Sequence, residues 1–148
     1  MSRSDDRVSS RHHDRLRTSL RWLFAASMVA VGISHFTHPE PFLKIMLPAL
    51  PAHLELVYLS GAFEILGGVG LLVPSTRRFS AWGLVALLIA VYPANIHMLV
   101  NDIYLDDMPR ERWILWARMP LQFVFIGLAL WTGGILGARS TEMEKADP

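Results

Sequence analysis

The chain has 148 residues, a formal net charge of +1 and no cysteine. The length suits one domain, and the lack of cysteine excludes disulfides, thiolate metal ligands and CxxC redox motifs. A net charge this small gives nucleic acid binding no electrostatic basis, so we expect no nucleic acid partner.

Apolar residues make up 52% of the chain, and they are gathered into four long segments. No Asp, Glu, Lys or Arg occurs in residues 22–39, 79–101 or 119–138, and residues 56–76 contain only Glu64. A helix that crosses the hydrocarbon core of a bilayer needs roughly 20 apolar residues. Four such segments leave too little polar sequence to cover a soluble core. The sequence therefore predicts an all-α integral membrane protein.

In chain order, the predicted elements begin with a polar segment. Residues 1–19 are rich in Ser, Arg, Asp and His, and we expect a basic cytoplasmic tail that is disordered or becomes helical only near the membrane. A basic leader is also typical of a signal peptide, but the apolar run continues through Phe36 without an A-x-A cleavage site. We therefore expect this run to remain as the first span of a membrane domain over residues 20–136. The four spans are Leu20–Phe36, Leu54–Val73, Phe79–Val100 and Trp113–Leu136, and a cytoplasmic tail of residues 137–148 follows them.

The links between the spans predict the relative direction of the helices and the orientation of the protein in the membrane. Short connections make neighbouring helices antiparallel. The N-terminal segment, the Arg77–Arg78 turn and the C-terminal tail place most basic residues on one side, which should be cytoplasmic. On the other side, acidic residues dilute Lys44, Arg110 and Arg112. We therefore expect an antiparallel four-helix transmembrane bundle in the cell membrane, with the N-terminus and the C-terminus in the cytoplasm.

Prolines mark two further features. Between prolines in the first outer link, Phe42–Leu47 predicts either a short helix on the membrane surface or a loop that packs over the mouth of the bundle. Pro93 and Pro120 lie inside the third and fourth spans. Each removes a backbone donor, and such irregularity is tolerated in a membrane where protein or a cavity covers it. The two positions suggest kinks that widen a pocket.

Polar residues of the predicted spans collect toward the outer side. At a rise of ~1.5 Å per residue, Asn95 and Arg118 lie roughly 8 Å from the outer helix ends, and Glu64 and Gln122 lie roughly 15 Å from them. A charged group at such depth costs at least ~3 kcal/mol, so it should face inward and find a partner. The predicted ligand-binding or polar pocket consists of His35, Glu64, Tyr92, Asn95, His97, Arg118 and Gln122.

Two interpretations of this pocket stay open. Glu64 and Arg118 are the expected ion pair, which would either hold the second helix against the fourth or bind a ligand. The small residues on the Glu64 face, among them Gly61 and Gly68, should let a neighbouring helix approach closely. His35 and His97 would either cap helix ends or serve a quinone, by binding its carbonyl or by relaying protons with Glu64. A haem is disfavoured because no haem motif surrounds the histidines, and no ligand spacing on one helix supports a metal site.

Five short motifs occur in order along residues 20–136. They are GISHF at Gly32, LPALP at Leu47, SGAFE at Ser60 with Gly67 and Gly68 after it, YPANIH at Tyr92, and RMPLQ at Arg118. In these motifs the chain resembles the DoxX-like family of small four-helix membrane proteins. Its namesake is the small subunit of a membrane thiosulfate:quinone oxidoreductase, and relatives are linked with respiratory or oxidative-stress redox complexes. The resemblance points to His35, Glu64, Asn95, His97, Arg118 and Gln122, whereas the lack of cysteine separates this chain from thiol-based relatives.

These observations predict an accessory subunit of a quinone-linked membrane redox system, with a quinone-like or lipid-like ligand near Glu64 and Arg118. The alternative is a non-enzymatic membrane protein, either a structural or interaction partner or a small transporter, in which Glu64 and Arg118 are structural. A transporter would usually show repeats or discontinuous helices, and no convincing repeat occurs. The expected partners are the bilayer and either an oxidoreductase subunit or further copies of this chain. No motif assigns a catalytic residue.

Overall fold

Helices account for all the regular structure that is described. The computed structural model describes the backbone of residues 3–105 and 109–136, and side chains from Asp14 onward within those ranges. The all-α class is confirmed for this part of the chain, and the predicted tail of residues 137–148 lies outside it. Four of the helices are long and apolar enough to cross a membrane. In chain order the helices are α1 (Arg3–Thr37), α2 (Glu40–Ile45), α3 (His53–Leu72), α4 (Arg77–Val100) and α5 (Arg112–Thr132).

The first helix is longer than the sequence suggests. Because α1 begins at Arg3, residues 14–19 are helical, which agrees with the alternative of a helix near the membrane and not with a disordered tail. Their helix has a tertiary partner: the Nε of Arg17 donates to the carbonyl of Trp131 at 2.9 Å, and the Nε of Arg21 donates to that of Thr132 at 2.8 Å. Both acceptors lie at the end of α5, where helix carbonyls lack partners within the helix. Sequence polarity alone does not reveal this contact.

The last helix is shorter than predicted. The fourth predicted span ends at Leu136, whereas α5 ends at Thr132. Gly134 adopts a φ of +80°, a left-handed conformation that favours glycine, and its N–H bonds the carbonyl of Trp131. The amide of Ile135 then bonds the carbonyl of Leu130, so the turn satisfies carbonyls at the helix end. The chain therefore leaves the helix four residues before the apolar sequence ends.

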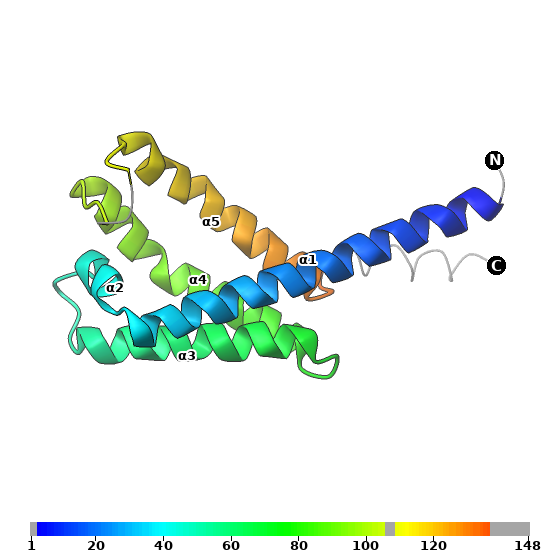
Figure 1. Ribbon diagram of the computed structural model, residues 1–148, viewed down its shortest axis with the longest axis horizontal. Coiled ribbons are helices and arrows are strands. Elements are labelled where there is room, and N and C mark those ends of the chain that lie inside the picture. The colour runs from blue at the N-terminus through cyan, green and yellow to red at the C-terminus, as the bar shows by residue number, and fades with distance from the viewer. Residues whose placement is uncertain (1–2, 106–108, 137–148) are drawn as a thin grey trace.

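The long helices form two pairs. Helix α1 packs along α3, α4 packs along α5, and α3 also contacts α4. In Figure 1 the two pairs lie close together where the α3–α4 turn lies and diverge toward α2. We call the first end, which carries Arg17, Arg21 and Arg77, the arginine end, and the other the α2 end. Helix α2 lies at the open end and contacts both α3 and α4.

Glycines set the close approach of α1 to α3. A Cβ atom on Gly61 would lie 2.7 Å from the carbonyl oxygen of Gly32, and a Cβ on Gly32 would lie 2.7 Å from that of Gly61. Seven residues further along α3, a Cβ on Gly68 would lie 2.8 Å from the carbonyl oxygen of Ala25. The expectation that the small residues of α3 let a neighbour approach closely is confirmed, and the neighbour is α1.

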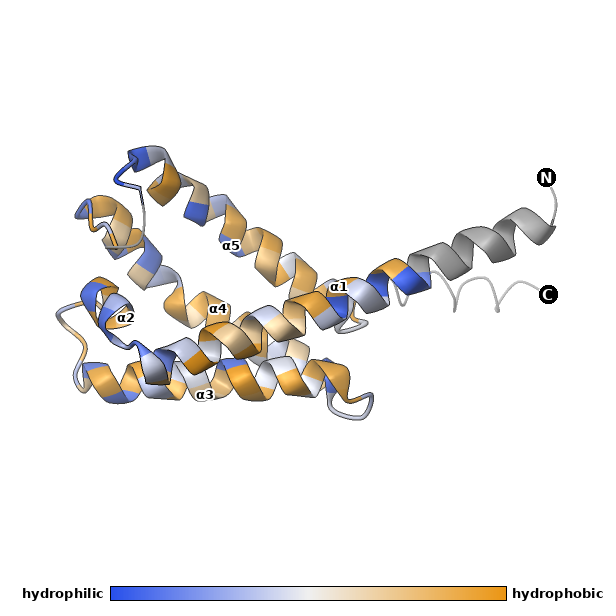
Figure 2. Ribbon diagram, in the orientation of Figure 1, coloured by the Kyte–Doolittle hydropathy of each residue, from blue (hydrophilic) through white to orange (hydrophobic). Residues whose placement is uncertain are grey.

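The tightest packing is near the arginine end. The side chains buried there come from all four long helices, so the core joins both pairs. Many large apolar side chains are exposed on the outside of the helices, and Phe79 is 83% exposed. The orange bands in Figure 2 show that apolar residues occur along all four long helices. An apolar exterior suits a protein surrounded by lipid rather than water. The core residues are Phe24, Met28, Leu71, Ala81, Leu84, Val85 and Ala129.

Candidate functional site

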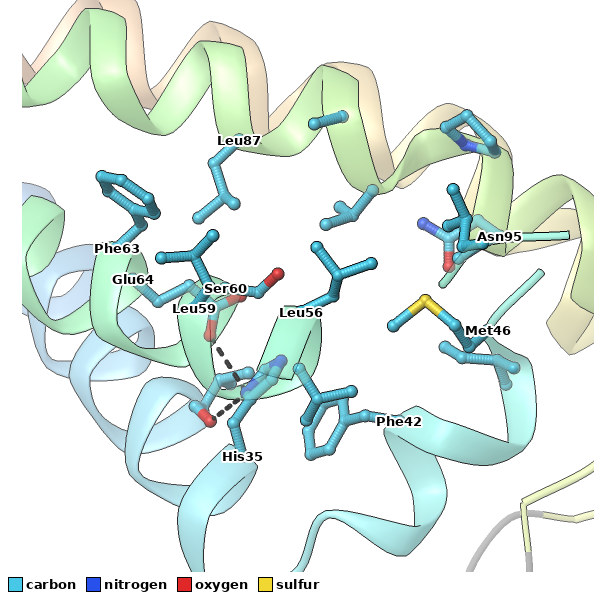
Figure 3. Close-up of a pocket in the computed structure, with 18 of the residues that line it drawn as sticks. His35, Phe42, Met46, Leu56, Leu59, Ser60, Phe63, Glu64, Leu87 and Asn95 are labelled. Carbon is cyan, nitrogen blue, oxygen red and sulfur yellow. Dashed lines mark hydrogen bonds and ion pairs between the residues drawn. The ribbon is translucent and has the colours of Figure 1, made fainter. Parts of the chain in front are cut away.

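A cavity of about 870 Å³ separates the two helix pairs at the α2 end. Four helices, α1 to α4, contribute to its lining, and Arg118 reaches it from α5. Most lining side chains are apolar, and Figure 3 shows Leu56, Leu59, Phe63 and Leu87 around the open space. An apolar space with a few polar groups is typical of small-molecule sites. The polar lining residues are His35, Ser60, Glu64, Asn95 and Arg118.

One wall of the cavity carries a histidine and a carboxylate from the α1–α3 pair. His35 Nδ1 lies 2.9 Å from the carbonyl oxygen of Val31 and 3.4 Å from Glu64 Oε2 (Figure 3). Because a carbonyl can only accept, Nδ1 carries the hydrogen in this arrangement. The longer contact is an ion-pair distance and leaves Glu64 Oε2 buried without a hydrogen-bond partner. This wall therefore presents an unsatisfied acceptor, and buried polar groups normally have partners.

The α2 helix covers this wall. The ring of Phe42 stacks on the imidazole of His35, with centroids 3.6 Å apart and planes inclined by 22°. Met46, just after the helix, lines the cavity near Asn95 (Figure 3). Of the two interpretations of Phe42–Leu47, the packing over the mouth agrees with these contacts, although the segment is helical. The contribution of α2 to the lining was missed in the set of predicted site residues, and the apolar stretch between prolines was its only signal.

The opposite wall is held by an amide pair between α4 and α5. Asn95 Nδ2 donates to Gln122 Oε1 at 3.1 Å, and Gln122 Nε2 donates to the carbonyl oxygen of Leu88. Asn95 lines the cavity, whereas Gln122 is buried behind it. Gln122 thus positions Asn95 and does not itself border the space. The two residues, both members of the predicted polar pocket, therefore have different roles.

Arg118 and Glu64 both line the cavity, but they do not form the predicted ion pair. Within the described residues Glu64 pairs with His35, and Arg118 Nη1 contacts Met98 Sδ at 3.5 Å. Glu64 lies on α3 and Arg118 on α5, which belong to different helix pairs that diverge at this end. The prediction of a Glu64–Arg118 ion pair is therefore wrong for this structure. The two side chains instead face a common space.

The remaining predicted site residues lie outside the cavity lining. His97 Nδ1 lies 3.2 Å from the carbonyl oxygen of Ile45, so this side chain ties α4 to α2. Tyr92 packs edge-on against Phe123 with ring centroids 5.6 Å apart. Both α4 and α5 continue as helices through Pro93 and Pro120, although Pro93 itself borders the cavity. His35 and His97 therefore serve separate contacts and do not both border the cavity.

The donor set of the cavity suits an organic ligand better than a metal ion. Among the described residues, no group of three or more His, Asp or Glu side chains is placed to hold a metal. The lining offers instead a guanidinium, an amide, a hydroxyl, an imidazole and a carboxylate spaced around apolar walls. Such groups can bind carbonyl or hydroxyl oxygens of a ligand whose remainder is apolar.

Comparison with protein families matches residues 24–133 to a domain of unknown function, DUF8561. The match covers α1 from Phe24 onward, the whole of α2 to α5, and every polar residue of the cavity lining. No curated protein and no solved structure matches the chain.

Proposed function

The chain belongs to the DUF8561 family, and from its cavity we propose that it binds a quinone-like amphiphile within the membrane. The observation that carries this proposal is the buried Oε2 of Glu64 at the wall of a large apolar cavity, which has an ionic contact to His35 but no hydrogen bond among the described residues. In function the protein is then an accessory subunit of a quinone-linked membrane redox system. The resemblance to the DoxX-like family supports the same class of function.

The distribution of polar groups fits a quinone ring. A quinone has two carbonyl acceptors, and the cavity holds N–H donors of Asn95 and Arg118 on one side. On the other side Nδ1 of His35 already bonds the Val31 carbonyl, so Nε2 donates to the second carbonyl only when the imidazole is protonated. On reduction the ring oxygens become hydroxyl donors, for which the carboxylate of Glu64 is an acceptor. The His35–Glu64 contact at 3.4 Å would let this wall exchange a proton with the ring. The apolar lining accommodates the ring faces and part of the chain.

The orientation proposed for the protein follows from its charges. We place the four helices across the cell membrane as an antiparallel bundle, with the arginine end and both termini in the cytoplasm. The cavity then lies in the outer half of the bilayer. A ligand with a polar head and an apolar tail can reach that depth by diffusing within the membrane, without passing through water.

The proposal is tested by purifying the protein in detergent, extracting its bound lipids for quinone analysis, and titrating the stripped protein with a short-chain quinone. Tryptophan fluorescence provides the binding signal. Glu64→Gln and Asn95→Leu should each weaken binding about tenfold, the effect of losing one hydrogen bond to a charged or well-placed group. Glu55→Gln is the matched control, because Glu55 is exposed on the same helix and does not line the cavity.

Two outcomes would contradict the proposal. Wild-type protein that carries no quinone and gives no saturable titration would exclude quinone binding. Equal affinities of Glu64→Gln and Glu55→Gln would show that binding takes place elsewhere. A phospholipid that co-purifies in place of quinone, and is lost from Asn95→Leu protein, would favour the non-enzymatic alternative, in which the cavity holds a lipid chain.

A further inference from the structure

Three arginines at the arginine end share one mode of bonding. Arg17, Arg21 and Arg77 each donate through Nε to a main-chain carbonyl oxygen, at 2.9, 2.8 and 3.0 Å. The acceptors belong to Trp131, Thr132 and Leu71, at the C-terminal ends of α5 and α3. Each guanidinium has five N–H donors, of which Nε carries one. Within residues 14–105 and 109–136, no hydrogen bond from the Nη groups of these arginines is found, so these groups can donate to other acceptors.

The positive charge of these three arginines exceeds the partial negative charge of the helix C-termini that they contact. The charges of Arg17 and Arg77 both act on the guanidinium of Arg21, so the three lie within electrostatic range of one another. None forms an ion pair with a carboxylate among the described residues, and all three are half-buried. A helix C-terminus carries a partial charge of roughly −0.5, so two helix ends supply about one negative charge. Three guanidiniums held together therefore retain an excess of about two positive charges.

The depth of the cluster matches the headgroup region of a bilayer. Arg21 is followed by Trp22, which is 60% exposed, and Trp82 on α4 is 56% exposed. Tryptophan side chains collect at the boundary between hydrocarbon and headgroups. Anionic phosphate groups are abundant at this level, and arginine binds phosphate oxygens through paired N–H donors.

We propose that Arg17, Arg21 and Arg77 form a binding site for one phosphate group, supplied by an anionic phospholipid. The phosphate oxygens accept hydrogen bonds from the Nη groups while the Nε bonds keep the guanidiniums in place. One bound lipid thereby links α1 to the α3–α4 turn at the end of α5. This site is separate from the cavity and does not depend on what the cavity binds.

The test counts lipids on the purified, delipidated full-length protein by native mass spectrometry. Its probes are phosphatidylglycerol, zwitterionic phosphatidylcholine and inorganic phosphate. Wild-type protein should retain one phosphatidylglycerol in preference to phosphatidylcholine, and Arg77→Gln and Arg17→Gln should each weaken that binding about tenfold. Arg110→Gln is the control, since it removes one charge from an exposed position in the α4–α5 link and should change affinity less than about twofold.

The outcomes separate the two sources of phosphate. If millimolar inorganic phosphate displaces phosphatidylglycerol only from protein with intact Arg17 and Arg77, the site takes free phosphate as well. Arg77→Lys keeps the charge but loses the planar donor geometry, and its intermediate affinity would support the site even if Arg77→Gln fails to fold. Equal phosphatidylglycerol affinity in wild type, Arg17→Gln, Arg77→Gln and Arg77→Lys would overturn the proposal and leave the arginines as caps of the helix ends.

Discussion

At the residue scale, the carboxylate of Glu64 lies in apolar surroundings with His35 as its ionic neighbour. The 3.4 Å contact does not satisfy Oε2, which is buried without a hydrogen bond. Burying a carboxylate oxygen without a hydrogen bond costs free energy. A hydrogen-bond donor of the proposed ligand would offset that cost.

Glu64→Gln should leave the fold intact and keep the free energy of unfolding within about 1 kcal/mol of wild type, or raise it, because neutral amides are cheaper to bury. Reversible unfolding in mixed micelles, followed by circular dichroism, measures this. Glu55→Gln serves as the exposed control on α3. A loss of more than about 2 kcal/mol in Glu64→Gln alone would show that the charge supports the fold.

At the element scale, the α1–α3 pair depends on contact between backbones. Gly61 faces Gly32 so closely that a methyl group on either would meet the other's carbonyl oxygen at 2.7 Å. A Cβ on Gly61 would also come within 2.6 Å of His35 Cβ. The same contact that joins the helices therefore places His35 against the turn of α3 that carries Glu64.

Gly61→Ala should lower the free energy of unfolding by about 1–3 kcal/mol, the usual cost of overpacking a tight contact. Gly83→Ala is the matched control, because a Cβ on Gly83 meets nothing within 4 Å. Since alanine favours helix more than glycine does, the control should raise stability by up to about 1 kcal/mol. Equal effects of the two substitutions in micelle unfolding would contradict the α1–α3 contact.

Helix α2 is the other element that shapes the cavity. It has six residues, so its own hydrogen bonds do not make it stable. Phe42 stacks on His35, and the carbonyl of Ile45 bonds His97. These two contacts hold α2 over the mouth of the cavity from two different helices.

His97→Gln should leave the four long helices in place but loosen α2. Loss of the bond to Ile45 should speed amide hydrogen exchange in residues 42–47 about tenfold, the effect of about 1.4 kcal/mol in the opening equilibrium. Hydrogen exchange read by mass spectrometry measures this. His38→Gln is the control, because His38 is exposed and its Nδ1 contacts only Thr37 Oγ1. Unchanged exchange in His97→Gln would contradict the anchoring role.

At the scale of the whole molecule, two helix pairs meet at the arginine end and diverge at the α2 end. The core that joins all four long helices lies at the first end, and the cavity lies at the second. The core cluster and the cavity thus lie at opposite ends of the protein. The proposed orientation places the packed end in the cytoplasm.

Because the chain contains no cysteine, single cysteines can report this orientation. Ser75→Cys lies in the α3–α4 turn and Ala49→Cys lies between α2 and α3, and both positions are exposed. A membrane-impermeant maleimide added to intact cells should label Ala49→Cys and leave Ser75→Cys unlabelled until the cells are lysed. The reverse pattern would show that the arginine end faces outward.

The sequence predicted much of the fold because each span carries its own signal. Spans predicted at Leu54–Val73 and Phe79–Val100 correspond to helices at His53–Leu72 and Arg77–Val100. The end of α5 and the length of α1 were less accurate, since the first depends on a left-handed glycine and the second on tertiary bonds of Arg17 and Arg21.

The sequence predicted how far the residues of the candidate site lie from the helix ends, but not which residues they contact. Position along a helix follows from residue number, so the sequence could place Glu64, Asn95 and Arg118 at the same end. Rotation about the helix axis and the choice of neighbour do not follow from it. Tyr92 and His97 therefore share that end but face other partners.

Hydropathy and helical rise are local properties, so the amino-acid sequence was enough to predict four apolar helices and the end at which their polar residues gather. The pairing of the helices became visible only in the folded protein, in which Glu64 meets His35 rather than Arg118. The physical reason is the close contact of Gly32 with Gly61, which joins α1 to α3 and leaves the α4–α5 pair to diverge. That divergence creates the cavity.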